Sequence, residues 1–304
     1  MKTMPSVAII IVNWNGLVYT DECLESLREL SYPNHKIILV DNGSADGSVS
    51  FFRRKYPKVG IIEHTENLGF TGGYNAGMGK ALEQEFDYVL LLNNDTIVKE
   101  ADFLSKMIEC CEDDEKIGMA CPTIYYDNPS DRAWYAGGWV SLWKGWGHHH
   151  QVPEDNAPQA TGYTTGCCLL AKAETIEDIG LLNVAYFLCV EDVEWSVRAK
   201  KKGWKTVYVP APSIIHKDSL SSRSKGKGMY SPTRVYHEFR NGIWFIREYA
   251  NTFQKVVVWP VRFGSRYLYK SAAYILLGRG KKLKALYRGM IDGLFTASER
   301  FKRM

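Results

Sequence analysis

The first hundred residues alternate short apolar runs with segments that have the periodicity of amphipathic helices. The apolar runs predict strands at 7–12, 36–40, 59–62 and 88–92. Helices are predicted between them, the first with Cys23, Leu24, Leu27 and Leu30 on one face and the others at 48–56 and 72–85. Continuous β-rich runs separated by such helices are typical of a parallel sheet covered on both faces. The pattern therefore predicts an α/β fold with a mostly parallel central sheet flanked by helices.

The pattern changes after the first 120 residues. Residues 127–165 are rich in Gly, Trp, His, Asn and Pro and have no clear period, so we expect loops and short strands that cover a pocket. Further on, a helix is predicted to begin near Glu191, and Gly203 is a plausible residue just beyond its end. A strand at 206–209 and a separate apolar run at 214–216 follow.

Cysteines and histidines give little support for a metal cluster or a disulfide framework. None of the seven cysteines falls in a C-x-x-C spacing, so free thiols in a reducing cytoplasm are the simpler interpretation. The histidines at 148–150 are adjacent, and adjacent side chains of an extended segment point to opposite faces. These three residues cannot all bind one ion, so we expect no metal site there.

Polar side chains follow each of the first four predicted strands. They are Asn13 and Asn15, then Asp41, then Asn67, and finally Asn93, Asn94 and Asp95. Any one of these groups could simply form a turn. Ligands of open parallel sheets, however, bind outside the carboxyl ends of the strands, where all four groups would converge. Together they predict a polar ligand pocket at that edge of the sheet.

Asp95 is the one acid of the N-N-D tripeptide and is a candidate ligand for a divalent metal. Hard cations such as Mg²⁺ and Mn²⁺ prefer carboxylate oxygen and commonly keep only one or two protein carboxylates. The same tripeptide is also a reasonable turn sequence. His216 ends an apolar run and could complete a metal site with Asp95, although a lone histidine is more often structural.

Glu191 and Asp192 fall in the first turn of a predicted helix, and two interpretations of this pair remain open. Acids at a helix start can be simple caps that the helix dipole stabilises. Alternatively, one carboxylate faces the pocket as a general base and accepts the proton of an attacking hydroxyl group. The residues alone favour neither interpretation.

The net charge of +4 conceals an asymmetry along the chain. From residue 240 onwards there are fourteen Lys or Arg and three acids. In this basic tail, apolar residues recur at helical spacing, namely Leu283, Leu286, Tyr287, Met290, Ile291 and Leu294. A basic amphipathic helix can lie in the interface of an anionic membrane, which is the partner we favour for the tail. Alternatively, the stripe packs on the catalytic domain or forms a dimer contact.

Two other interpretations of the chain are disfavoured by its sequence. No run of eighteen apolar residues occurs, so no membrane-spanning helix is expected. No recognised nucleic-acid-binding motif accompanies the basic residues of the tail, so nucleic acid is not an expected partner.

Several motifs, taken in order, resemble those of the family 2 glycosyltransferases with a GT-A fold, in particular the rhamnosyltransferase-like branch. They are IIVNWNG at 10–16, VDNGSADGS at 40–48, ENLGF at 66–70, GGYNAG at 72–77, LLNND at 91–95, TGCCLL at 165–170, EDVE at 191–194, His216, and Arg240 with Asn241. Each motif is modest alone, but the ordered set is specific and extends over about residues 5 to 245.

The resemblance implies a role for each matching residue. The nucleotide-sugar site would contain Val12, Asn13, Asn15, Asp41, Asn67, Gly72, Gly73, Asn75, Asn93, Asn94 and Asp95, with Asp41 reading the pyrimidine base. Asp95 would bind Mn²⁺ or Mg²⁺ in place of the family's D-x-D motif, with His216 as a second ligand. Asp192 matches the usual catalytic base, and Glu191 is its neighbour. The sequence departs from the family pattern at 93 and 94, where acids are absent.

The implied activity is inverting transfer of rhamnose or a hexose from a dTDP- or UDP-linked donor to a hydroxyl of a glycan or lipid-linked saccharide. The implied domains are a GT-A catalytic domain at 1–240 and a basic helical tail at 241–304. Within the catalytic domain, 5–120 would bind the nucleotide sugar and 121–240 would hold the acceptor and the base. We expect a cytoplasmic protein, peripheral on the inner face of the membrane, that could form homo-oligomers.

Three alternatives remain for comparison. A sugar nucleotidyltransferase also binds nucleotides on an α/β sheet, but the loop after the first strand, 13–17, lacks the cations needed to hold a triphosphate. A nicotinamide-binding enzyme has even less support, because no G-x-G-x-x-G follows a strand. The non-enzymatic alternative is a membrane-associated scaffold that keeps the fold without turnover.

Overall fold

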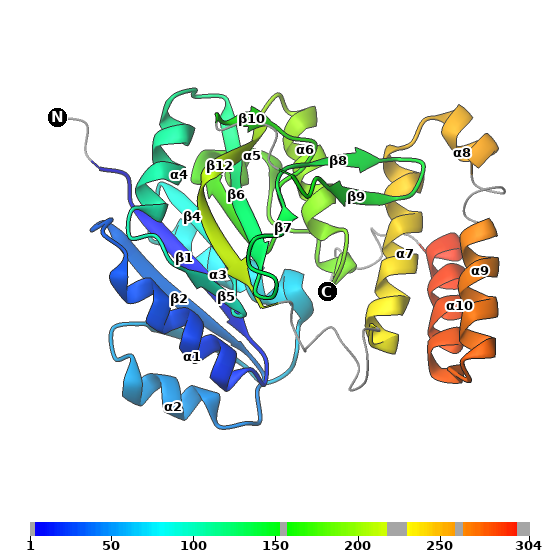
Figure 1. The fold of residues 1–304 in the computed structure, drawn as a ribbon, viewed down its shortest axis with the longest axis horizontal. Coiled ribbons are helices and arrows are strands. Elements are labelled where there is room, and N and C mark those ends of the chain that lie inside the picture. Colours follow the sequence, from blue (N-terminus) through cyan, green and yellow to red (C-terminus); the bar gives the residue numbers. More distant parts are fainter. Residues whose placement is uncertain (1–3, 153–156, 218–229, 259–263, 297–304) are drawn as a thin grey trace. The chain divides into compact units, whose positions relative to one another are not determined.

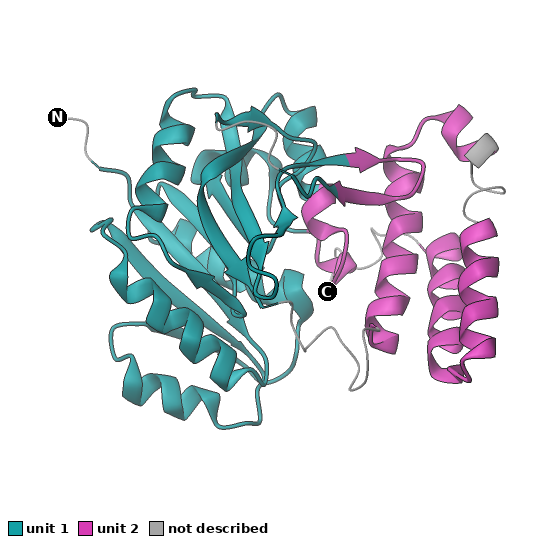
Figure 2. Cartoon of the chain, viewed as in Figure 1, with its two compact units in different colours: residues 1–139, 149–182, 195–218 teal, residues 140–148, 183–194, 219–304 magenta. Residues whose placement is uncertain are grey.

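The computed structural model describes residues 4–152, 157–217, 230–258 and 264–296 (Figure 1). These residues form two compact units (Figure 2). Unit 1 comprises residues within 1–139, 149–182 and 195–218, and it contains the large sheet. Unit 2 comprises residues within 140–148, 183–194 and 219–304, and it contains the C-terminal helices.

The first four strands of unit 1 are parallel, as the sequence pattern predicts. They are β1 (Val7–Asn13), β2 (His35–Asn42), β3 (Gly60–His64) and β4 (Tyr88–Asn93). Strand β1 pairs with β2 on one side and with β4 on the other, and β3 pairs with β2. The predicted boundaries differ from these by two residues at most. The α/β fold with a mostly parallel, helix-flanked sheet is thereby confirmed.

Beyond β4 the sheet becomes mixed. Strand β11 (Cys168–Lys172) lies between β4 and β6 (Ile117–Tyr126) and is antiparallel to both. Strand β12 (Lys205–His216) pairs in parallel with β6, and the short strand β5 (Thr96–Val98) pairs antiparallel with β12. The run of strands across the sheet is β10-β12-β6-β11-β4-β1-β2-β3.

Strand β12 corrects one sequence-based expectation, which was two separate apolar segments at 206–209 and 214–216. The chain is continuous strand from Lys205 to His216, with a shift in its pairing to β6 between Val209 and Ser213. Two prolines at 210 and 212 lie in the shifted stretch. Proline has no N–H to donate to a ladder, so a local irregularity lets the strand pass through them.

Helix α3 (Gly69–Glu83) packs closely against the first strands, with the help of two glycines. A Cβ at Gly73 would lie 2.8 Å from Cγ1 of Val12, and one at Gly77 would clash with Cγ2 of Ile10. One face of the sheet forms a continuous core with α3, α5 and α6, in which Ile10, Val40, Leu91, Tyr74, Met78, Ile176 and Trp195 are buried. Glycine at both positions therefore allows the helix to approach the sheet.

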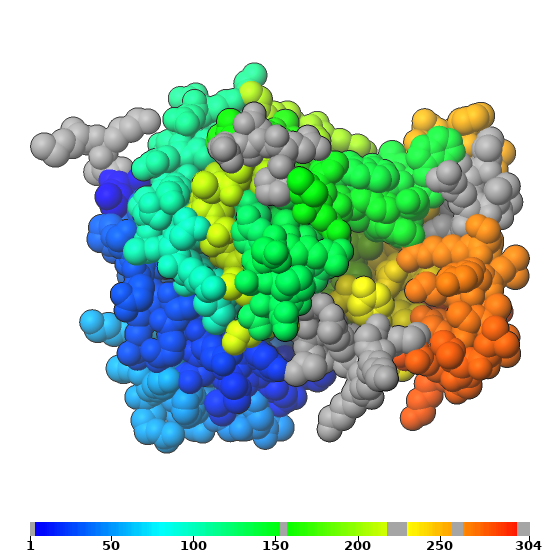
Figure 3. All heavy atoms as spheres, in the orientation of Figure 1, coloured from blue at the N-terminus to red at the C-terminus, as the bar shows by residue number. Residues whose placement is uncertain are grey.

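Five further helices of the described residues belong wholly or partly to unit 1, and the sequence pattern predicted the first, second and last of these. They are α1 (Leu17–Ser26), α2 (Ser48–Lys55), α4 (Phe103–Glu112), α5 (Ala173–Ile179) and α6 (Glu191–Lys201), the last of which begins in unit 2. Figure 1 shows α1 on the near side of the sheet, and the space-filling view shows α1 and α2, in blue, on this surface (Figure 3).

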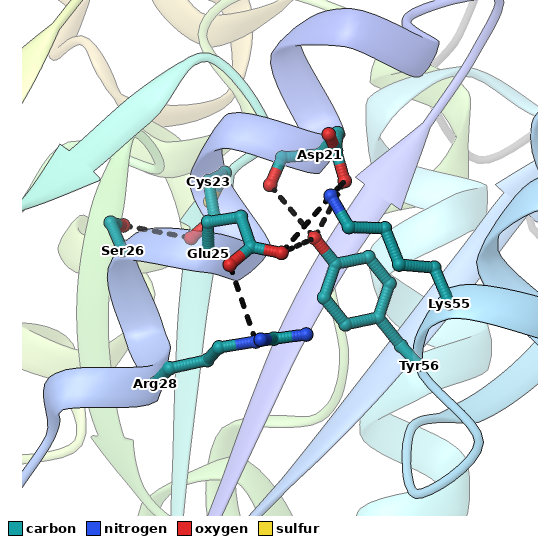
Figure 4. A network of polar contacts seen from close by, with 7 residues as sticks. All are labelled: Asp21, Cys23, Glu25, Ser26, Arg28, Lys55 and Tyr56. Atoms are coloured by element: carbon teal, nitrogen blue, oxygen red, sulfur yellow. Dashed lines mark hydrogen bonds and ion pairs between the residues drawn. The ribbon is translucent and has the colours of Figure 1, made fainter.

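A polar cluster joins α1 to the end of α2 (Figure 4). The hydroxyl of Tyr56 lies 2.6 Å from Oδ1 of Asp21 and 2.7 Å from Oε1 of Glu25. Lys55 Nζ lies 2.6 Å from Asp21 Oδ1, and Arg28 Nε lies 3.3 Å from Glu25 Oε2. The hydrogen bond from Tyr56 and the pairing with Lys55 lower the pKa of Glu25. The two acids therefore stay ionised and hold the helices together.

The segment at 127–165 forms short strands, as expected. Its described strands are β7 (Ala133–Tyr135), β8 (Gly138–Ser141), β9 (Trp146–His149) and β10 (Gln159–Ala160). Strands β8 and β9 form a separate two-stranded sheet. The seven cysteines are free, and six of them are buried.

Unit 2 contains η2 (Val184–Tyr186), α7 (Pro232–Tyr249), α8 (Thr252–Val258), α9 (Gly264–Leu276) and α10 (Gly280–Phe295). Helix α7 begins with Ser231, which accepts a hydrogen bond from the Arg234 N–H at 3.2 Å, and with Pro232 in the first turn. Helix α10 packs along α7, because Gly289 and Gly293 bring the two backbones together. A Cβ at Gly289 would lie 2.5 Å from the carbonyl oxygen of Tyr236.

Most of the apolar stripe of α10 packs within unit 2, which is the alternative that the sequence left open, while the membrane contact expected for the tail stays a prediction. Leu286 is fully buried, and Leu283, Met290 and Leu294 pack against the core that α7 forms within unit 2. Of the six stripe residues, Tyr287 and Ile291 are the exposed large apolar ones. Helical periodicity identifies an apolar face but not its partner, and here the main partner is another helix.

Candidate functional site

The carboxyl ends of β1 and β2 carry a buried hydrogen-bonded pair. Asn13 and Asp41 lie opposite each other in the pairing of the two strands. The Asn13 amide donates to Oδ1 of Asp41 at 2.8 Å, and Oδ2 of Asp41 accepts from the Ser44 N–H at 2.9 Å. Asn15 follows with a positive φ of 49°, and its Oδ1 accepts from the Ala45 N–H at 2.8 Å. The two strand-end loops are thus bonded together.

Asn42 and Asn67 form the next part of this edge. The Asn42 amide donates to Oδ1 of Asn67 at 3.1 Å and to the Gly69 carbonyl at 2.9 Å, and Oδ1 of Asn42 accepts from the Leu68 N–H at 3.2 Å. Asn42 was not among the predicted site residues. Its position directly after Asp41 at a strand end was the available signal. Gly72 and Gly73 follow in the first turns of α3.

Asn75 uses both ends of its amide on one backbone position. Its Nδ2 donates to the Leu182 carbonyl at 2.8 Å, and its Oδ1 accepts from the Leu182 N–H at 3.0 Å. These two bonds fix the chain after α5 against α3. The nucleotide contact that the resemblance implies for Asn75 stays a prediction.

The N-N-D tripeptide follows β4, and each of its residues makes a different contact. Asn93 Oδ1 accepts from the Tyr74 hydroxyl at 3.2 Å. Asn94 donates to Oγ1 of Thr20 at 2.8 Å, and that hydroxyl donates to Oδ1 of Asn13 at 2.8 Å. The tripeptide is therefore linked to the end of β1. Through these bonds the predicted residues Asn13, Asp41 and Asn94 belong to one polar network.

Asp95 and His216 lie together and are buried, with 3% and 6% of their surfaces exposed. Nε2 of His216 is 3.3 Å from Oδ1 of Asp95, close enough for an ion pair but not aligned as a hydrogen bond. Among the described residues, Oδ2 of Asp95 has no hydrogen-bond partner. Although burial opposes it, the Cys167 thiol and the Asp95 carboxylate beside the His216 ring raise the pKa of His216. Buried polar atoms are rarely left unsatisfied in proteins. An oxygen and a nitrogen in this arrangement fit a divalent cation.

The structure offers no larger cluster of metal ligands within the ranges it describes. No group of three or more His, Cys, Asp or Glu side chains is arranged to hold a metal there. The adjacent histidines include His149, whose Nδ1 lies 2.9 Å from the Trp134 carbonyl. A cation at Asp95 and His216 would therefore need further ligands from a substrate or from water.

The acid pair lies in unit 2, at the first turn of α6. Glu191 is buried, and its Oε2 has no hydrogen-bond partner among the described residues. Burial and then the charge of Asp192 raise the pKa of Glu191 to about 8. Asp192 is half-buried, and its Oδ1 accepts from the Val193 N–H at 2.8 Å. Glu191 therefore holds its proton at neutral pH.

The segment that leads into this pair has an unusual backbone. Three non-glycine residues have positive φ angles: Phe187 at 59°, Cys189 at 70° and Val190 at 73°. Such conformations cost roughly 1–3 kcal/mol each and persist where the surroundings impose them. A β-branched residue such as Val190 is a strong outlier in this region.

Two residues of α7 hold this strained segment in place. The Asn241 amide lies 2.8 Å from each of three carbonyl oxygens, those of Tyr186, Leu188 and Cys189. Nη2 of Arg240 donates to the Ala185 carbonyl at 2.6 Å, and its Nε donates to Oδ1 of Asn241 at 2.9 Å. The motif comparison found this Arg-Asn pair but gave it no role. Its role could not be read from sequence, because the contacts join residues more than fifty positions apart.

Residues 8–180 match the family described as Glycosyl transferase family 2. This match extends over more than half of the chain, and the chain belongs to that family. Glycosyltransferase activity with a nucleotide-sugar donor follows from this membership. The relationship to the rhamnosyltransferase-like branch rests on the individual relatives.

Two of these relatives are rhamnosyltransferases. The N-acetylglucosaminyl-diphospho-decaprenol L-rhamnosyltransferase of Mycobacterium tuberculosis is 22% identical, over 76% of this chain and 81% of the relative. The dTDP-rhamnosyl transferase RfbF of Shigella flexneri is 22% identical, over 80% of each chain. This chain therefore resembles rhamnosyltransferases over most of their length.

Two solved structures have the same fold. One is the mannosyltransferase PcManGT from Pyrobaculum calidifontis in complex with GDP-Man and Mn²⁺, with a TM-score of 0.62 and 17% identity over 97% of this chain and 88% of that one. The other is GalNAc-T7 with UDP, GalNAc and Mn²⁺, with a TM-score of 0.66 and 14% identity over 99% and 59% of the two chains. The predicted GT-A fold is confirmed.

Proposed function

We propose that this glycosyltransferase moves rhamnose, or else a hexose, from a dTDP- or UDP-linked donor to a hydroxyl group of a glycan or lipid-linked saccharide. The two rhamnosyltransferases to which it is similar support rhamnose as the first sugar to test. Within the structure, one observation gives the proposal its main support. Asp95 and His216 form a buried pair in which Oδ2 of Asp95 has no hydrogen-bond partner among the described residues, and Asp95 lies two residues after β4, at the sheet edge where α/β proteins bind ligands.

Asp95 and His216 would hold a divalent cation, Mn²⁺ or Mg²⁺. Carboxylate oxygen suits both ions, and two protein ligands leave room for diphosphate oxygens and water. When bound, such a cation neutralises the charge that develops on a diphosphate leaving group. Asn93 and Asn94 provide neutral amides where other family members have acids, so Asp95 is the single carboxylate of the tripeptide.

Asp192 would act as the base. The acceptor hydroxyl oxygen forms a bond to the anomeric carbon while the bond from that carbon to the diphosphate breaks, and Asp192 takes the hydroxyl proton. This single displacement inverts the anomeric centre and needs no covalent nucleophile. The environment supports Asp192 over Glu191, because a carboxyl group with a pKa of about 8 is mostly protonated at pH 7.

Transfer kinetics on two isosteric variants test this assignment. Asp192→Asn keeps the size of the side chain but cannot accept a proton, so it should lower the transfer rate about 10²- to 10⁴-fold with donor affinity near wild type. Glu191→Gln should have a milder effect, because it replaces a neutral acid with a neutral amide. If Asp192→Asn keeps normal activity while Glu191→Gln is inactive, the base is Glu191 instead.

The proposed place of action is the inner face of the membrane, with the protein bound peripherally from the cytoplasm. In the described ranges, no helix combines the length and the apolar character needed to cross a bilayer. The name of the Mycobacterium tuberculosis relative includes a decaprenol-linked saccharide, which supports a lipid-linked acceptor for this chain as well.

A sugar nucleotidyltransferase is the main alternative enzyme. Such an enzyme needs cationic groups to hold a triphosphate, but Trp14, Asn15 and Gly16 follow β1 here. A catalytically inactive scaffold of the same fold is the other alternative. Turnover of a sugar nucleotide separates all three, because each releases a different product or none.

A further inference from the structure

Helix α9 presents its large apolar side chains outward. Leu268 and Tyr269 are each 72% exposed, Ile275 is 63% exposed and Leu276 is 84% exposed. Its inward side instead consists of Tyr267, Ser271 and Tyr274, all buried. This distribution is unusual, because a helix on the surface of a domain normally turns its apolar side inward. The outward apolar side chains of α9 therefore form an exposed surface that a binding partner could cover.

Helix α10 extends this surface. It packs beside α9 within unit 2, where Figure 1 shows the two helices next to each other, and Figure 3 shows part of their outer surface in orange and red. Tyr287, Ile291 and Phe295 of α10 are exposed, as is Leu277 just after α9. We call these exposed apolar residues of the two helices the α9–α10 face. It comprises Leu268, Tyr269, Ile275, Leu276, Leu277, Tyr287, Ile291 and Phe295.

Basic residues accompany the α9–α10 face. Residues 264–296 contain seven Lys or Arg and a single acid, Asp292. Of these bases, Lys282 is buried and Arg266 pairs with Glu238 of α7, so five remain for the surface of the two helices. Asp292 already accepts a hydrogen bond from the Tyr236 hydroxyl at 2.7 Å and lies 3.7 Å from Nε of Arg288. Lys281 and Lys284 are exposed on α10. The surface therefore combines apolar and aromatic side chains with an excess of positive charge.

We propose that the α9–α10 face is the surface through which the protein binds an anionic lipid bilayer. Exposed Leu, Ile and Phe side chains can enter the boundary between headgroups and acyl chains, and Tyr suits that boundary because one end of its ring is polar. The Lys and Arg side chains meet anionic headgroups. This proposal rests on the membrane association proposed above and deepens it: it assigns the contact to the exposed residues of α9 and, on α10, to Tyr287, Ile291 and Phe295 rather than to the buried part of the α10 stripe.

Charge favours a bilayer over a second copy of this chain. A symmetric dimer through this surface would place the same patch against itself. The exposed Lys281 and Lys284 of both copies would then share one interface, and Asp292 of each copy already contacts Tyr236 and Arg288. An anionic membrane offers the opposite charge instead.

Vesicle co-sedimentation of the full chain tests the proposal. The probe is a set of phosphatidylcholine vesicles with and without phosphatidylglycerol, and the variants are Leu268→Ser with Leu276→Ser, and Lys281→Gln with Lys284→Gln. Wild type should bind the anionic vesicles, and the leucine variant should bind them at least about tenfold more weakly, because it removes two exposed apolar side chains. The lysine variant should bind more weakly to anionic vesicles, and added salt should weaken wild type.

A matched control comes from α1, where Val18 is 63% exposed and lies in unit 1. Val18→Ser should bind vesicles as wild type does. The proposal is overturned if the leucine variant binds anionic vesicles as strongly as wild type. It is also overturned if wild type is a dimer by light scattering that the leucine variant converts to monomer without any vesicle binding.

Measuring sugar-nucleotide turnover alongside vesicle binding distinguishes failure of the membrane proposal from failure of the proposed function. The leucine variant should retain the donor turnover of wild type in the absence of vesicles, which also shows that it is folded. Failure of turnover in wild type, with vesicle binding intact, would reject the enzymatic proposal and leave the membrane surface standing.

Discussion

Asp95 is the residue on which the proposed metal site depends, because its Oδ2 is buried without a hydrogen-bond partner in the described structure. Asp95→Asn keeps the shape of the side chain but removes its charge. We expect the Mn²⁺-dependent part of donor affinity to be lost, a change of about tenfold or more for the loss of one of two protein ligands. Calorimetry with a nucleotide sugar, with and without Mn²⁺, measures this.

A matched control for Asp95→Asn is Asp114→Asn, which changes a carboxylate that pairs with Lys205 on the surface of unit 1. Donor affinity of the control should respond to Mn²⁺ as wild type does. If Asp95→Asn retains the full effect of Mn²⁺, then Asp95 is not a metal ligand.

Glu191 should make the stability of the protein depend on pH. Its folded-state pKa of about 8 lies above the usual value of 4.5, so the folded state holds this proton more tightly than the unfolded state. The stabilisation is fully present below about pH 4.5 and is lost as the pH rises towards 8, with a slope of at most ~1.4 kcal/mol per pH unit. Urea unfolding at several pH values should show this decline in wild type.

Glu191→Gln should flatten that decline, because glutamine does not titrate. The comparison of the two proteins cancels the contribution of other groups. Equal pH dependence of the two free energies of unfolding, between pH 5 and 8, would show that Glu191 titrates normally in the folded protein.

Individual site residues could be predicted only in part. The strand ends predicted Asn13, Asp41 and Asp95, because open parallel sheets bind ligands at that edge, and their roles in binding stay predictions. The protonation of Glu191 could not be predicted, since it depends on burial by distant parts of the chain. Asn42 was missed because a second polar residue after Asp41 is equally compatible with a simple turn.

At the scale of single elements, the approach of α3 to β1 depends on glycine. Gly77→Ala would place a methyl group against Ile10 and should cost about 1–3 kcal/mol, as overpacking does. Gly79 lies in the same helix with open space around the position of a Cβ, so Gly79→Ala should stabilise the protein by about 0.4–1 kcal/mol. Thermal unfolding of the pair measures both effects. Equal shifts of Tm for the two variants would contradict the packing described.

The hydrogen bonds of Asn241 to the strained segment before α6 lead to a second prediction at this scale. Asn241 contacts three carbonyl groups of 186–189, so Asn241→Ala should release the segment that positions the acid pair. We expect a loss of about 1–3 kcal/mol in stability, the typical cost of leaving buried polar groups unpaired. We also expect kcat to fall more than KM changes, because the base is misplaced rather than the donor site.

Asn34→Ala is the matched control for Asn241→Ala, because Asn34 is exposed and its side chain donates a hydrogen bond to the Met4 carbonyl. Its kinetics should equal those of wild type. Normal kcat in Asn241→Ala, despite reduced stability, would show that the hydrogen bonds of Asn241 stabilise the fold but do not position the acids.

The elements themselves were predicted well where local periodicity decides them. The four parallel strands and the helices between them were found within a few residues. The antiparallel insertion of β11 between β4 and β6 could not be seen, because strand order depends on contacts between distant segments. The packing of four stripe residues of α10 within unit 2 could not be decided from sequence for the same reason, since lipid and protein both select an apolar helical face.

For the whole molecule, the family match at 8–180 contains Asp95, whereas Glu191, Asp192, His216 and Asn241 lie beyond it. The proposed chemistry therefore needs residues from both the matched region and the rest of the chain. The predicted metal ligands belong to unit 1 and the predicted base to unit 2. The proposed membrane surface also belongs to unit 2, so loss of membrane binding and loss of turnover can be separated by mutation.

Donor turnover by the purified chain tests the central claim most directly. The chain would be incubated with a panel of sugar nucleotides that begins with dTDP-rhamnose and UDP-linked hexoses, in Mn²⁺ and in excess chelator, and the nucleotide products would be separated by chromatography. The account predicts that at least one donor yields its nucleoside diphosphate and the free or transferred sugar, and that chelator suppresses this release. A nucleoside triphosphate formed when pyrophosphate is added, or no turnover of any donor, would contradict it.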